Sequence, residues 1–237
     1  MVNKWLNSIQ RVIMPARCFL CGAKSDQRVD LCHGCHQDLP WLGHSCYRCA
    51  LPLAVASEAC CGKCQHQPPP FQKTLSLLHY HYPIDHLITG LKFHQQLSYA
   101  RLLGTLLGIG AMADYEGSKL PQAIIPVPLH RQRLRERGYN QALEIARFCA
   151  RETGLPVLPD CCQRVRNTGQ QTGLQASQRK QNLRGAFSLT FTPPLNSIAL
   201  VDDVMTTGAT LSELSRTFMN AGIGEIHLWC IARTPFK

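Results

Sequence analysis

The sequence predicts an α/β protein in which helices flank a parallel sheet, preceded by a small N-terminal module that binds metal. Three observations support this fold class. After residue 70, apolar segments of strand length alternate with amphipathic segments of helix length, which is the pattern of a doubly wound parallel sheet. Near the end of the chain, two adjacent aspartates separate a buried strand from a loop of small residues. Near its beginning, eight cysteines form four Cys-x2-Cys pairs.

The elements of the main domain follow in order along the chain. Residues 74–82 alternate enough between apolar and polar side chains to form a strand, and the leucines of residues 98–113 recur at helical spacing. Gly154 suits the position after a helix C-terminus. The predicted elements are a strand at 74–82, helices at 85–93 and 98–113, a strand at 123–128, a helix at 140–152, a strand at 198–201 with a helix after it, and a last strand at 225–232.

The composition limits the class of protein. A chain of 237 residues has room for one α/β domain and a small appendage. Residues 1–13 place apolar side chains at helical spacing between charged ones, rather than in the apolar run of a secretory signal. The longest apolar stretch, residues 102–113, is too short to span a bilayer. We therefore expect a cytoplasmic protein without membrane insertion, whose cysteines are reduced and bind metal.

The N-terminal cysteines form a duplicated pattern. The first two Cys-x2-Cys pairs recur 28 and 29 residues later, which indicates a repeated unit. Two such turns supply the four thiolates of a tetrahedral zinc site. We predict two structural Zn²⁺ ions, because four cysteines per site leave no position open for catalysis. The ligands are Cys18, Cys21, Cys32 and Cys35 in the first site, and Cys46, Cys49, Cys61 and Cys64 in the second.

The cysteine pattern leaves alternatives open. A cross-braced arrangement would join the first pair with the third, although sequential pairing closes shorter loops at lower entropic cost. Cys60 could replace Cys61, and His33 or His36 could substitute in the first site. Disulfides or a redox Cys-x2-Cys are further alternatives. Three prolines at 68–70 indicate a stiff linker, so we predict an N-terminal helix and double zinc ribbon at residues 1–67 and the main domain at residues 71–237.

Residues 198–210, I-A-L-V-D-D-V-M-T-T-G-A-T, are typical of a ligand site. The carboxylates of Asp202 and Asp203 suit vicinal hydroxyls or Mg²⁺. A loop of small residues before a helix presents backbone N–H groups and a positive dipole end to a phosphate. An ordinary acidic turn is the alternative, and the motifs of a P-loop or a dinucleotide-binding loop are absent. The predicted phosphate-binding residues are Thr206, Thr207, Gly208, Ala209 and Thr210.

Positive charge is concentrated in the middle of the chain. The net charge is +10, and residues 131–184 contain eleven Lys or Arg but four Asp or Glu. Such a stretch favours phosphorylated ligands, nucleic acid, or both, although a solvated face without a partner is the alternative. Residues 126–141 follow a strand and read as a basic loop carrying Arg131, Arg133, Arg135 and Arg137. Residues 164–187 read as a long mobile loop rich in Gln, Gly, Thr and Arg.

These motifs resemble known families. The D-D-x-x-T-T-G-x-T segment resembles the fingerprint of type I phosphoribosyltransferases, in which two acids hold the ribose hydroxyls of phosphoribosyl pyrophosphate (PRPP) and the loop holds its 5′-phosphate. The full order, from cysteine ribbons through L-K-F, P-V-P…R-G-Y-N-Q and R-x-R-x-T to D-D-x-x-T-T-G-x-T, is similar to the ComF family and covers nearly the whole chain. That resemblance implies a phosphoribosyltransferase-like fold in a pathway that handles imported single-stranded DNA.

The resemblance also implies roles for individual residues. Asp202 and Asp203 would hold the ribose, with Mg²⁺ accompanying PRPP. Together with Arg137 they are the candidate catalytic residues. Arg137, Gly138 and Asn140 would contact pyrophosphate, while a lid or nucleic-acid surface would comprise Arg131, Arg133, Arg135, Arg164, Arg166, Gln171 and Arg179. Glutamine-dependent amination, as in amidophosphoribosyltransferases, is not expected, because a zinc module stands where those enzymes carry their glutaminase domain.

Three functions are compatible with these residues. The first is DNA handling on a PRPP-binding fold, with single-stranded DNA and a DNA-uptake machinery or a helicase as partners. The second is an active phosphoribosyltransferase, whose acceptor the sequence does not identify. The third treats PRPP as a regulatory ligand of a DNA-handling protein. We rank the first above the second.

Overall fold

The computed structural model describes residues 17–25, 28–54, 59–168 and 183–235. Contacts divide the chain into two compact units, Met1–Pro40 and Trp41–Lys237. The first unit contains the first cysteine group and the short helix α2 (His33–Gln37). The second contains the second cysteine group, with helix α3 (Gly62–His66), and the sheet. The domain boundary at residues 67–71 stays a prediction, while by contacts the second cysteine group belongs with the sheet.

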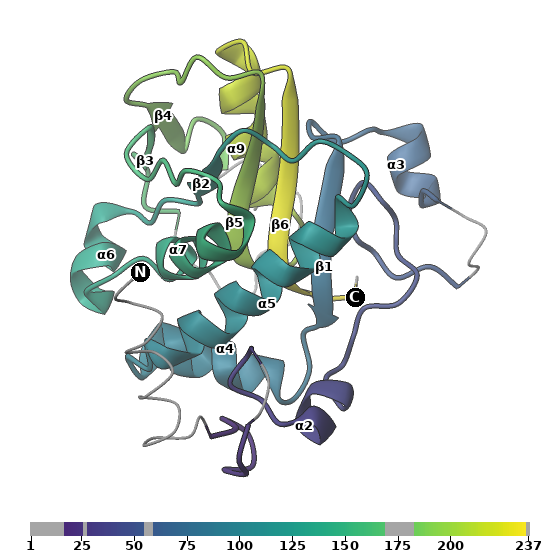
Figure 1. The fold of residues 1–237 in the computed structure, drawn as a ribbon. Helices are drawn as coiled ribbons and strands as arrows, with labels where there is room; N and C mark the ends of the chain where they lie inside the picture. Colours follow the sequence, from purple (N-terminus) through teal and green to yellow (C-terminus); the bar gives the residue numbers. More distant parts are fainter. Residues whose placement is uncertain (1–16, 26–27, 55–58, 169–182, 236–237) are drawn as a thin grey trace. The chain divides into compact units, whose positions relative to one another are not determined.

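A four-stranded parallel sheet forms the centre of the second unit (Figure 1). Its order is β1-β6-β5-β2, so the two longest strands lie in the middle. Because all neighbours pair in parallel, the carboxyl ends of the four strands meet at one edge, where ligands of such sheets bind. The predicted α/β fold with an N-terminal zinc ribbon is confirmed. The strands are β1 (Lys73–His79), β6 (Glu225–Arg233), β5 (Ser197–Met205) and β2 (Ile124–Pro126).

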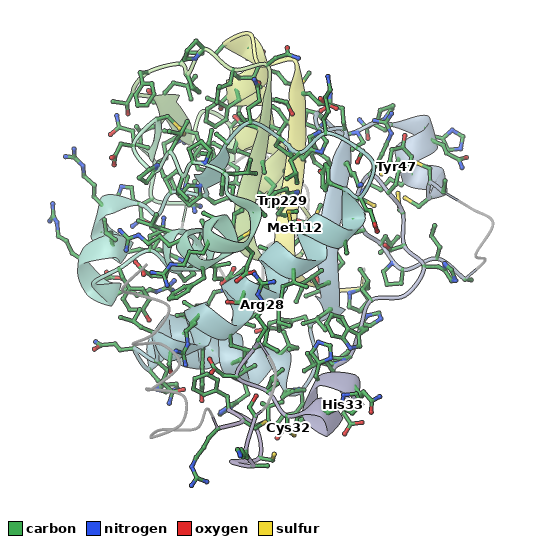
Figure 2. The ribbon with its side chains drawn as sticks, viewed as in Figure 1. Arg28, Cys32, His33, Tyr47, Met112 and Trp229 are labelled. Carbon is green, nitrogen blue, oxygen red and sulfur yellow. The ribbon has the colours of Figure 1, made fainter. Side chains whose placement is uncertain are left out.

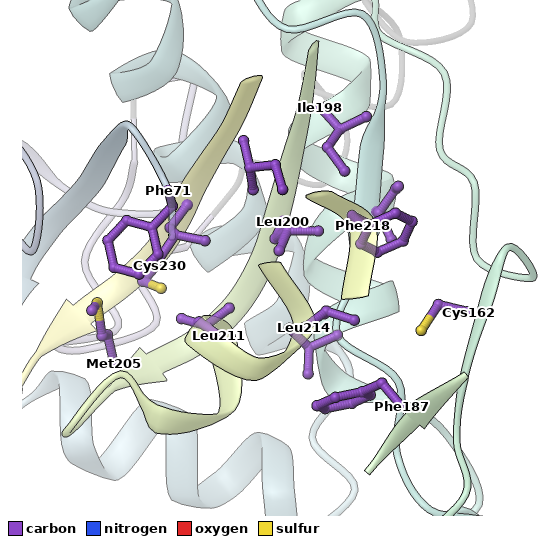
Figure 3. Packing of buried hydrophobic residues seen from close by; sticks show 14 of the residues in the cluster. Phe71, Cys162, Phe187, Ile198, Leu200, Met205, Leu211, Leu214, Phe218 and Cys230 are labelled. Atoms are coloured by element: carbon purple, nitrogen blue, oxygen red, sulfur yellow. The ribbon is translucent and has the colours of Figure 1, made fainter. Parts of the chain in front are cut away.

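Helices cover both faces of the sheet, as a parallel sheet with buried strands requires. In Figure 1, α5 and α7 cover the near face and α9 lies behind the strands. Behind the sheet, Leu214 and Phe218 of α9 pack against Leu200 of β5 (Figure 3). On the near face, Figure 2 shows the buried Trp229 of β6 behind α5. The helices are α4 (Ile84–Phe93), α5 (Ser98–Asp114), α6 (Arg131–Arg137), α7 (Gln141–Thr153) and α9 (Ala209–Asn220).

Two short strands differ from the sequence-based prediction. Residues 164–187 were expected to form one long loop, but β3 (Cys162–Arg164) and β4 (Phe187–Leu189) pair as an antiparallel hairpin at its base. The strands are three residues long, too short for a visible alternation of side chains. Residues 169–182, and with them Gln171 and Arg179, lie outside the described residues.

The other elements predicted for the main domain are present, with ends shifted by a few residues, while the predicted N-terminal helix lies outside the described residues. Gly154 takes the left-handed conformation, with φ of 73°, at the end of α7, as predicted. The arginine-rich residues 131–137, expected as a loop, form helix α6. His130 caps this helix by accepting from the Gln132 N–H, and Gly138 ends it with a φ of 85°. None of the described helices is both long enough and apolar enough to cross a membrane.

A glycine sets the close contact between α5 and α7. A Cβ atom on Gly104 would lie 2.4 Å from the Ile145 carbonyl oxygen and 2.7 Å from the Phe148 Cβ. Both neighbours belong to α7, so a larger side chain would push the two helices apart. We predict that Gly104→Ala lowers the free energy of unfolding by about 1–3 kcal/mol, partly offset by the higher helix propensity of alanine.

Thermal and urea denaturation measure this effect, with Gly43→Ala as the matched control. Gly43 has open space around its Cβ position and an ordinary φ. An unfolding midpoint for Gly104→Ala equal to that of Gly43→Ala would contradict the close packing of α5 on α7.

Candidate functional site

The two aspartates lie within β5, at the carboxyl edge of the sheet. They were expected just after the strand, but β5 continues to Met205 and pairs with β6 as far as Arg233. The backbone therefore stays extended through both acids, and their side chains point to opposite faces of the sheet. Asp203 is buried, with 3% of its surface exposed, while Asp202 is partly exposed.

A lysine from another element neutralises the buried carboxylate. The Lys92 Nζ atom of α4 lies 2.6 Å from the Asp203 Oδ2 atom, and the Val204 N–H donates to Asp203 Oδ1 at 2.8 Å. Burial alone would lower the pKa of Lys92, but the Asp203 carboxylate raises it above its ordinary value, so the lysine stays charged. Burial and the neighbouring Asp203 raise the pKa of Asp202 to about 8. The two acids are thus not equivalent: Asp203 belongs to a buried ion pair, and Asp202 faces the site.

The segment after β5 has the geometry of an anion-binding loop. Gly208 precedes α9 with a φ of 74°, a conformation that side chains other than glycine rarely adopt. Within the described part of the chain, the backbone N–H groups of Thr206, Thr207 and Gly208 donate to no protein acceptor. Three unsatisfied donors beside the positive end of a twelve-residue helix suit a phosphate group.

Helix α6 sorts the four arginines onto two faces. Residues four apart share a face of a helix, so Arg133 and Arg137 lie together, and so do Arg131 and Arg135. The first pair is half-buried and the second pair is exposed. Burial lowers the pKa of Arg137, while the nearby carboxylates of Asp203 and Asp202 act in the opposite direction. Arg133 and Arg137 therefore face the acids, and Arg131 and Arg135 face solvent.

The residues after α6 hold this helix beside the sheet. The Asn140 side chain donates to the Val127 carbonyl at 3.0 Å and accepts from the Ala142 N–H at 3.0 Å. Its amide thus caps α7, and its predicted contact with pyrophosphate stays a prediction. Arg137 donates to the Gln141 side chain, and its guanidinium carbon lies 5.5 Å from the centre of the Phe93 ring. The Phe93 side chain beside the Arg137 guanidinium is 63% exposed.

The base of the β3–β4 hairpin brings a further cation to the site. Arg164 donates to Thr168, and its guanidinium carbon lies 5.7 Å from the Phe187 ring centre. Burial lowers the pKa of Arg164, Arg133 lowers it further, and Asp202 raises it, which places the three charges near one another. Arg166 instead donates to the Arg184 carbonyl at 2.7 Å and braces the two ends of the loop.

Lys92 is the site residue that sequence reasoning did not assign. It lies in the L-K-F motif at residues 91–93, which contributed to the family resemblance but received no role. The motif predicted nothing about contacts because α4 and β5 are more than a hundred residues apart in the chain. A single lysine in an amphipathic helix is more often a solvated side chain.

The cysteine groups fit zinc. In each group, the four sulfur atoms lie within 4.8 Å of one another. Tetrahedral sites with Zn–S bonds of about 2.3 Å place the sulfurs about 3.8 Å apart. The Sγ atoms of Cys21 and Cys32 are 3.6 Å apart, and those of Cys49 and Cys61 are 3.7 Å apart. Pairing is therefore sequential, and Cys61 rather than Cys60 completes the second group, as predicted.

The local backbone prepares one thiolate in each group. Burial acts to raise the pKa of Cys18, but backbone N–H groups, including that of Cys32, lower it to about 6. In the same way, backbone N–H groups including that of Cys61 outweigh burial and lower the pKa of Cys46 to about 7. Zinc binds the deprotonated thiolate, so these turns favour the form that coordinates the metal.

The Lys92–Asp203 pair gives a stability prediction. Lys92→Met would leave the Asp203 carboxylate buried without its partner, and breaking such a pair costs about 3–5 kcal/mol. We expect the double variant Lys92→Met/Asp203→Asn to lose much less than the sum of the two single variants. Urea denaturation of the four proteins measures the coupling.

The exposed pair Arg147–Glu144 on α7 is the control for this cycle. Its Arg147→Ala variant should change stability by less than about 1 kcal/mol. Additive effects of the Lys92 and Asp203 substitutions would contradict a buried, coupled pair.

Comparison with known proteins agrees with the cysteine geometry and extends to the whole chain. The family model of the double zinc ribbon domain matches residues 9–65. The chain is 39% identical over 227 residues to competence protein F of Haemophilus influenzae, covering 92% of this chain and 96% of that relative. It is 31% identical over 224 residues to the DNA utilization protein YhgH of Escherichia coli, covering 93% and 98%.

A more distant relative is competence protein ComFC of Bacillus subtilis, 26% identical over 211 residues, which cover 84% of this chain and 81% of that protein. The matches with competence protein F and YhgH span nearly the full length of both partners, zinc ribbons and sheet together. The chain therefore belongs to the ComF family of competence and DNA utilisation proteins.

Proposed function

We propose that this protein binds PRPP with Mg²⁺ at the carboxyl edge of its sheet and handles imported single-stranded DNA in competence or DNA utilisation. One observation carries the proposal: the N–H groups of Thr206, Thr207 and Gly208, which donate to no acceptor among the described residues, follow the acidic pair of β5 closely. In a ribose 5-phosphate, the phosphate group would accept from these N–H groups, and the ribose hydroxyls would donate to a carboxylate at that spacing. The relatives named for competence and DNA utilisation supply the biological setting.

The charges around the acids suit the remaining part of PRPP. Its pyrophosphate group would carry negative charge toward Arg137 and Arg164, which are half-buried near Asp202. Phosphate oxygens and a carboxylate are the ligands that Mg²⁺ prefers, and Asp202 is the acid free of the Lys92 ion pair. Asp203 would contribute through that ion pair, by holding Lys92 at the edge of the site. In this proposal the ribose hydroxyls contact Asp202 rather than Asp203.

The DNA surface is proposed on the exposed face of α6. Arg131 and Arg135 point to solvent, and the half-buried face of the same helix lies by the acids. Guanidinium groups on one helix can follow a phosphate backbone without reading its sequence. The exposed Phe93 ring beside Arg137 offers a face on which a base could stack. The proposed setting is the cytoplasm, with a DNA-uptake machinery or a helicase as partner.

Binding of PRPP predicts stabilisation of the folded state. At a concentration of PRPP with Mg²⁺ a hundred times its Kd, the free energy of unfolding should rise by about 2.7 kcal/mol. The increase should be lost in Asp202→Asn and kept in Asp160→Asn, which changes an exposed aspartate outside the site. A thermal-shift titration measures both.

No shift for the wild-type protein would contradict PRPP binding, and an equal shift in Asp202→Asn would contradict the assigned site. Pyrophosphate release in the same samples, with nucleobases or amines added, tests the alternative function of an active phosphoribosyltransferase. In that function, Arg137 and the hairpin arginines would stabilise the charge of the leaving pyrophosphate.

The DNA surface predicts a salt-dependent affinity. For single strands, the logarithm of the binding constant falls with the logarithm of the salt concentration, with a slope of about −0.7 per phosphate contacted. Arg131→Ala/Arg135→Ala should weaken binding of an oligonucleotide about equally for all sequences and reduce the slope. Fluorescence anisotropy at several salt concentrations measures the slope.

The control variant Arg147→Ala/Arg151→Ala removes the same charge from two exposed arginines of α7. If the control weakens binding as much as the α6 variant, net charge rather than this surface is responsible. A salt-independent affinity would contradict phosphate recognition altogether.

A further inference from the structure

A buried arginine joins the second cysteine group to the phosphate loop. Arg233 is the last residue of β6, and none of its surface is exposed. Its Nε atom donates to the Cys49 carbonyl oxygen at 2.9 Å. Its Nη1 atom donates to the carbonyl oxygen of Met205 at 2.9 Å and also to that of Thr206. One side chain therefore contacts a predicted zinc ligand residue, the last residue of β5 and the first residue of the loop that follows β5.

Both ends of this connection are fixed elements. Cys49 belongs to the second four-cysteine group, whose four members are all buried. The turn that carries it also pairs with the sheet, because the Thr74 N–H donates to the Tyr47 carbonyl at 2.8 Å. At the other end, the Thr234 N–H donates to the Met205 carbonyl at 3.1 Å. Arg233 thus lies between two anchored segments of the same compact unit.

The hydrogen bonds of Arg233 determine where the loop N–H groups point. In a trans peptide, the C=O and the following N–H point in opposite directions. Holding the Met205 and Thr206 carbonyls toward Arg233 therefore turns the N–H groups of Thr206 and Thr207 away from it. Those are two of the three loop donors for which the described part of the chain offers no acceptor. The guanidinium fixes the orientation of the donors that would meet a phosphate.

The fork of the guanidinium is needed for this arrangement. Arginine presents five N–H donors in a rigid plane, whereas lysine is a point charge on a flexible stem. A buried cation that lost one of its carbonyl acceptors would be destabilised, and it would move to recover a partner. If the Cys49 turn loosened, the guanidinium would shift, and the Met205 and Thr206 peptides would lose their fixed orientation.

We propose that Arg233 is a positioning residue through which zinc in the second ribbon orders the phosphate loop. Zinc at Cys46, Cys49, Cys61 and Cys64 fixes the Cys49 carbonyl, which fixes Arg233, which fixes the peptides of the loop. For its ligand the inference rests on the proposed PRPP function, whereas the ordering of the loop does not. Coupling between two sites is reciprocal, so PRPP with Mg²⁺ tightens zinc binding by the same factor by which zinc tightens PRPP binding.

Nitrogen-15 relaxation without ligand tests the ordering. The backbone amide order parameters of residues 206–208 are expected to fall from about 0.85 in the wild-type protein to below about 0.6 in Arg233→Lys, while both retain two zinc ions per chain. Arg216→Lys is the matched control, because Arg216 is an exposed arginine paired with Glu213 on α9. Equal loop order parameters in zinc-loaded Arg233→Lys and wild type overturn the proposal.

Substitution of the predicted zinc-binding cysteines tests the part played by the metal. This test does not depend on the Arg233→Lys variant being folded. Cys64→Ser removes a ligand of the second group and Cys35→Ser a ligand of the first. Cys64→Ser is expected to lower the order parameters of residues 206–208 below about 0.6, and Cys35→Ser to leave them at about 0.85. Loop order parameters that are unchanged in Cys64→Ser, or equally lowered in both, overturn the coupling.

PRPP affinity separates this inference from the proposed function. Calorimetry with PRPP and Mg²⁺ should give a Kd at least tenfold weaker for Cys64→Ser and for Arg233→Lys, with no further loss when the two are combined. Absence of binding to the wild-type protein refutes the PRPP function, while the relaxation data still decide the ordering. Wild-type affinity in the folded Arg233→Lys variant refutes the positioning role alone.

Discussion

The pairing of β5 with β6 past the two aspartates is the constraint on which the rest of the site depends. The ladder joins Asp202 to Cys230 and ends where Met205 meets Arg233. It keeps the backbone extended through the acids, so Asp203 enters the interior while Asp202 stays at the edge. The chain must then turn within three residues to begin α9. In our proposal, a loop that short, held on both sides, has its N–H groups oriented before PRPP binds.

The charged side chains around this edge belong to α4, α6, β3 and β5, and most of them are partly buried. Lys92, Arg133, Arg137 and Arg164 surround the two aspartates. Burial opposes the charged form of each group, which lowers the pKa of Arg137 and Arg164 and raises that of Asp202. The ligand-free site thus holds more positive than negative charge at a desolvated surface. A polyanion would relieve this imbalance, and the PRPP that we propose as ligand is one.

The two cysteine groups share a donor set but not their surroundings. The first belongs to the unit of residues 1–40, where Cys21 is exposed. The second is buried throughout and touches the sheet through Arg233 and Thr74. A repeated sequence therefore supplies the same metal chemistry twice, while its different contacts permit different roles. The second ribbon is suited to act on the sheet, because the Cys49 carbonyl accepts from Arg233 at the carboxyl end of β6.

Local patterns in the sequence determined the four strands of the parallel sheet, the long helices, the loop before α9 and both cysteine groups. These depend on neighbours a few residues apart, such as Cys-x2-Cys spacing or the glycine before α9. The sequence did not determine the helical form of residues 131–137, the β3–β4 hairpin, or the unequal burial of Asp202 and Asp203. Nor could it pair Lys92 with Asp203 or place Arg233 against Cys49. Those contacts join residues more than a hundred positions apart, and only the folded sheet brings them within hydrogen-bonding distance.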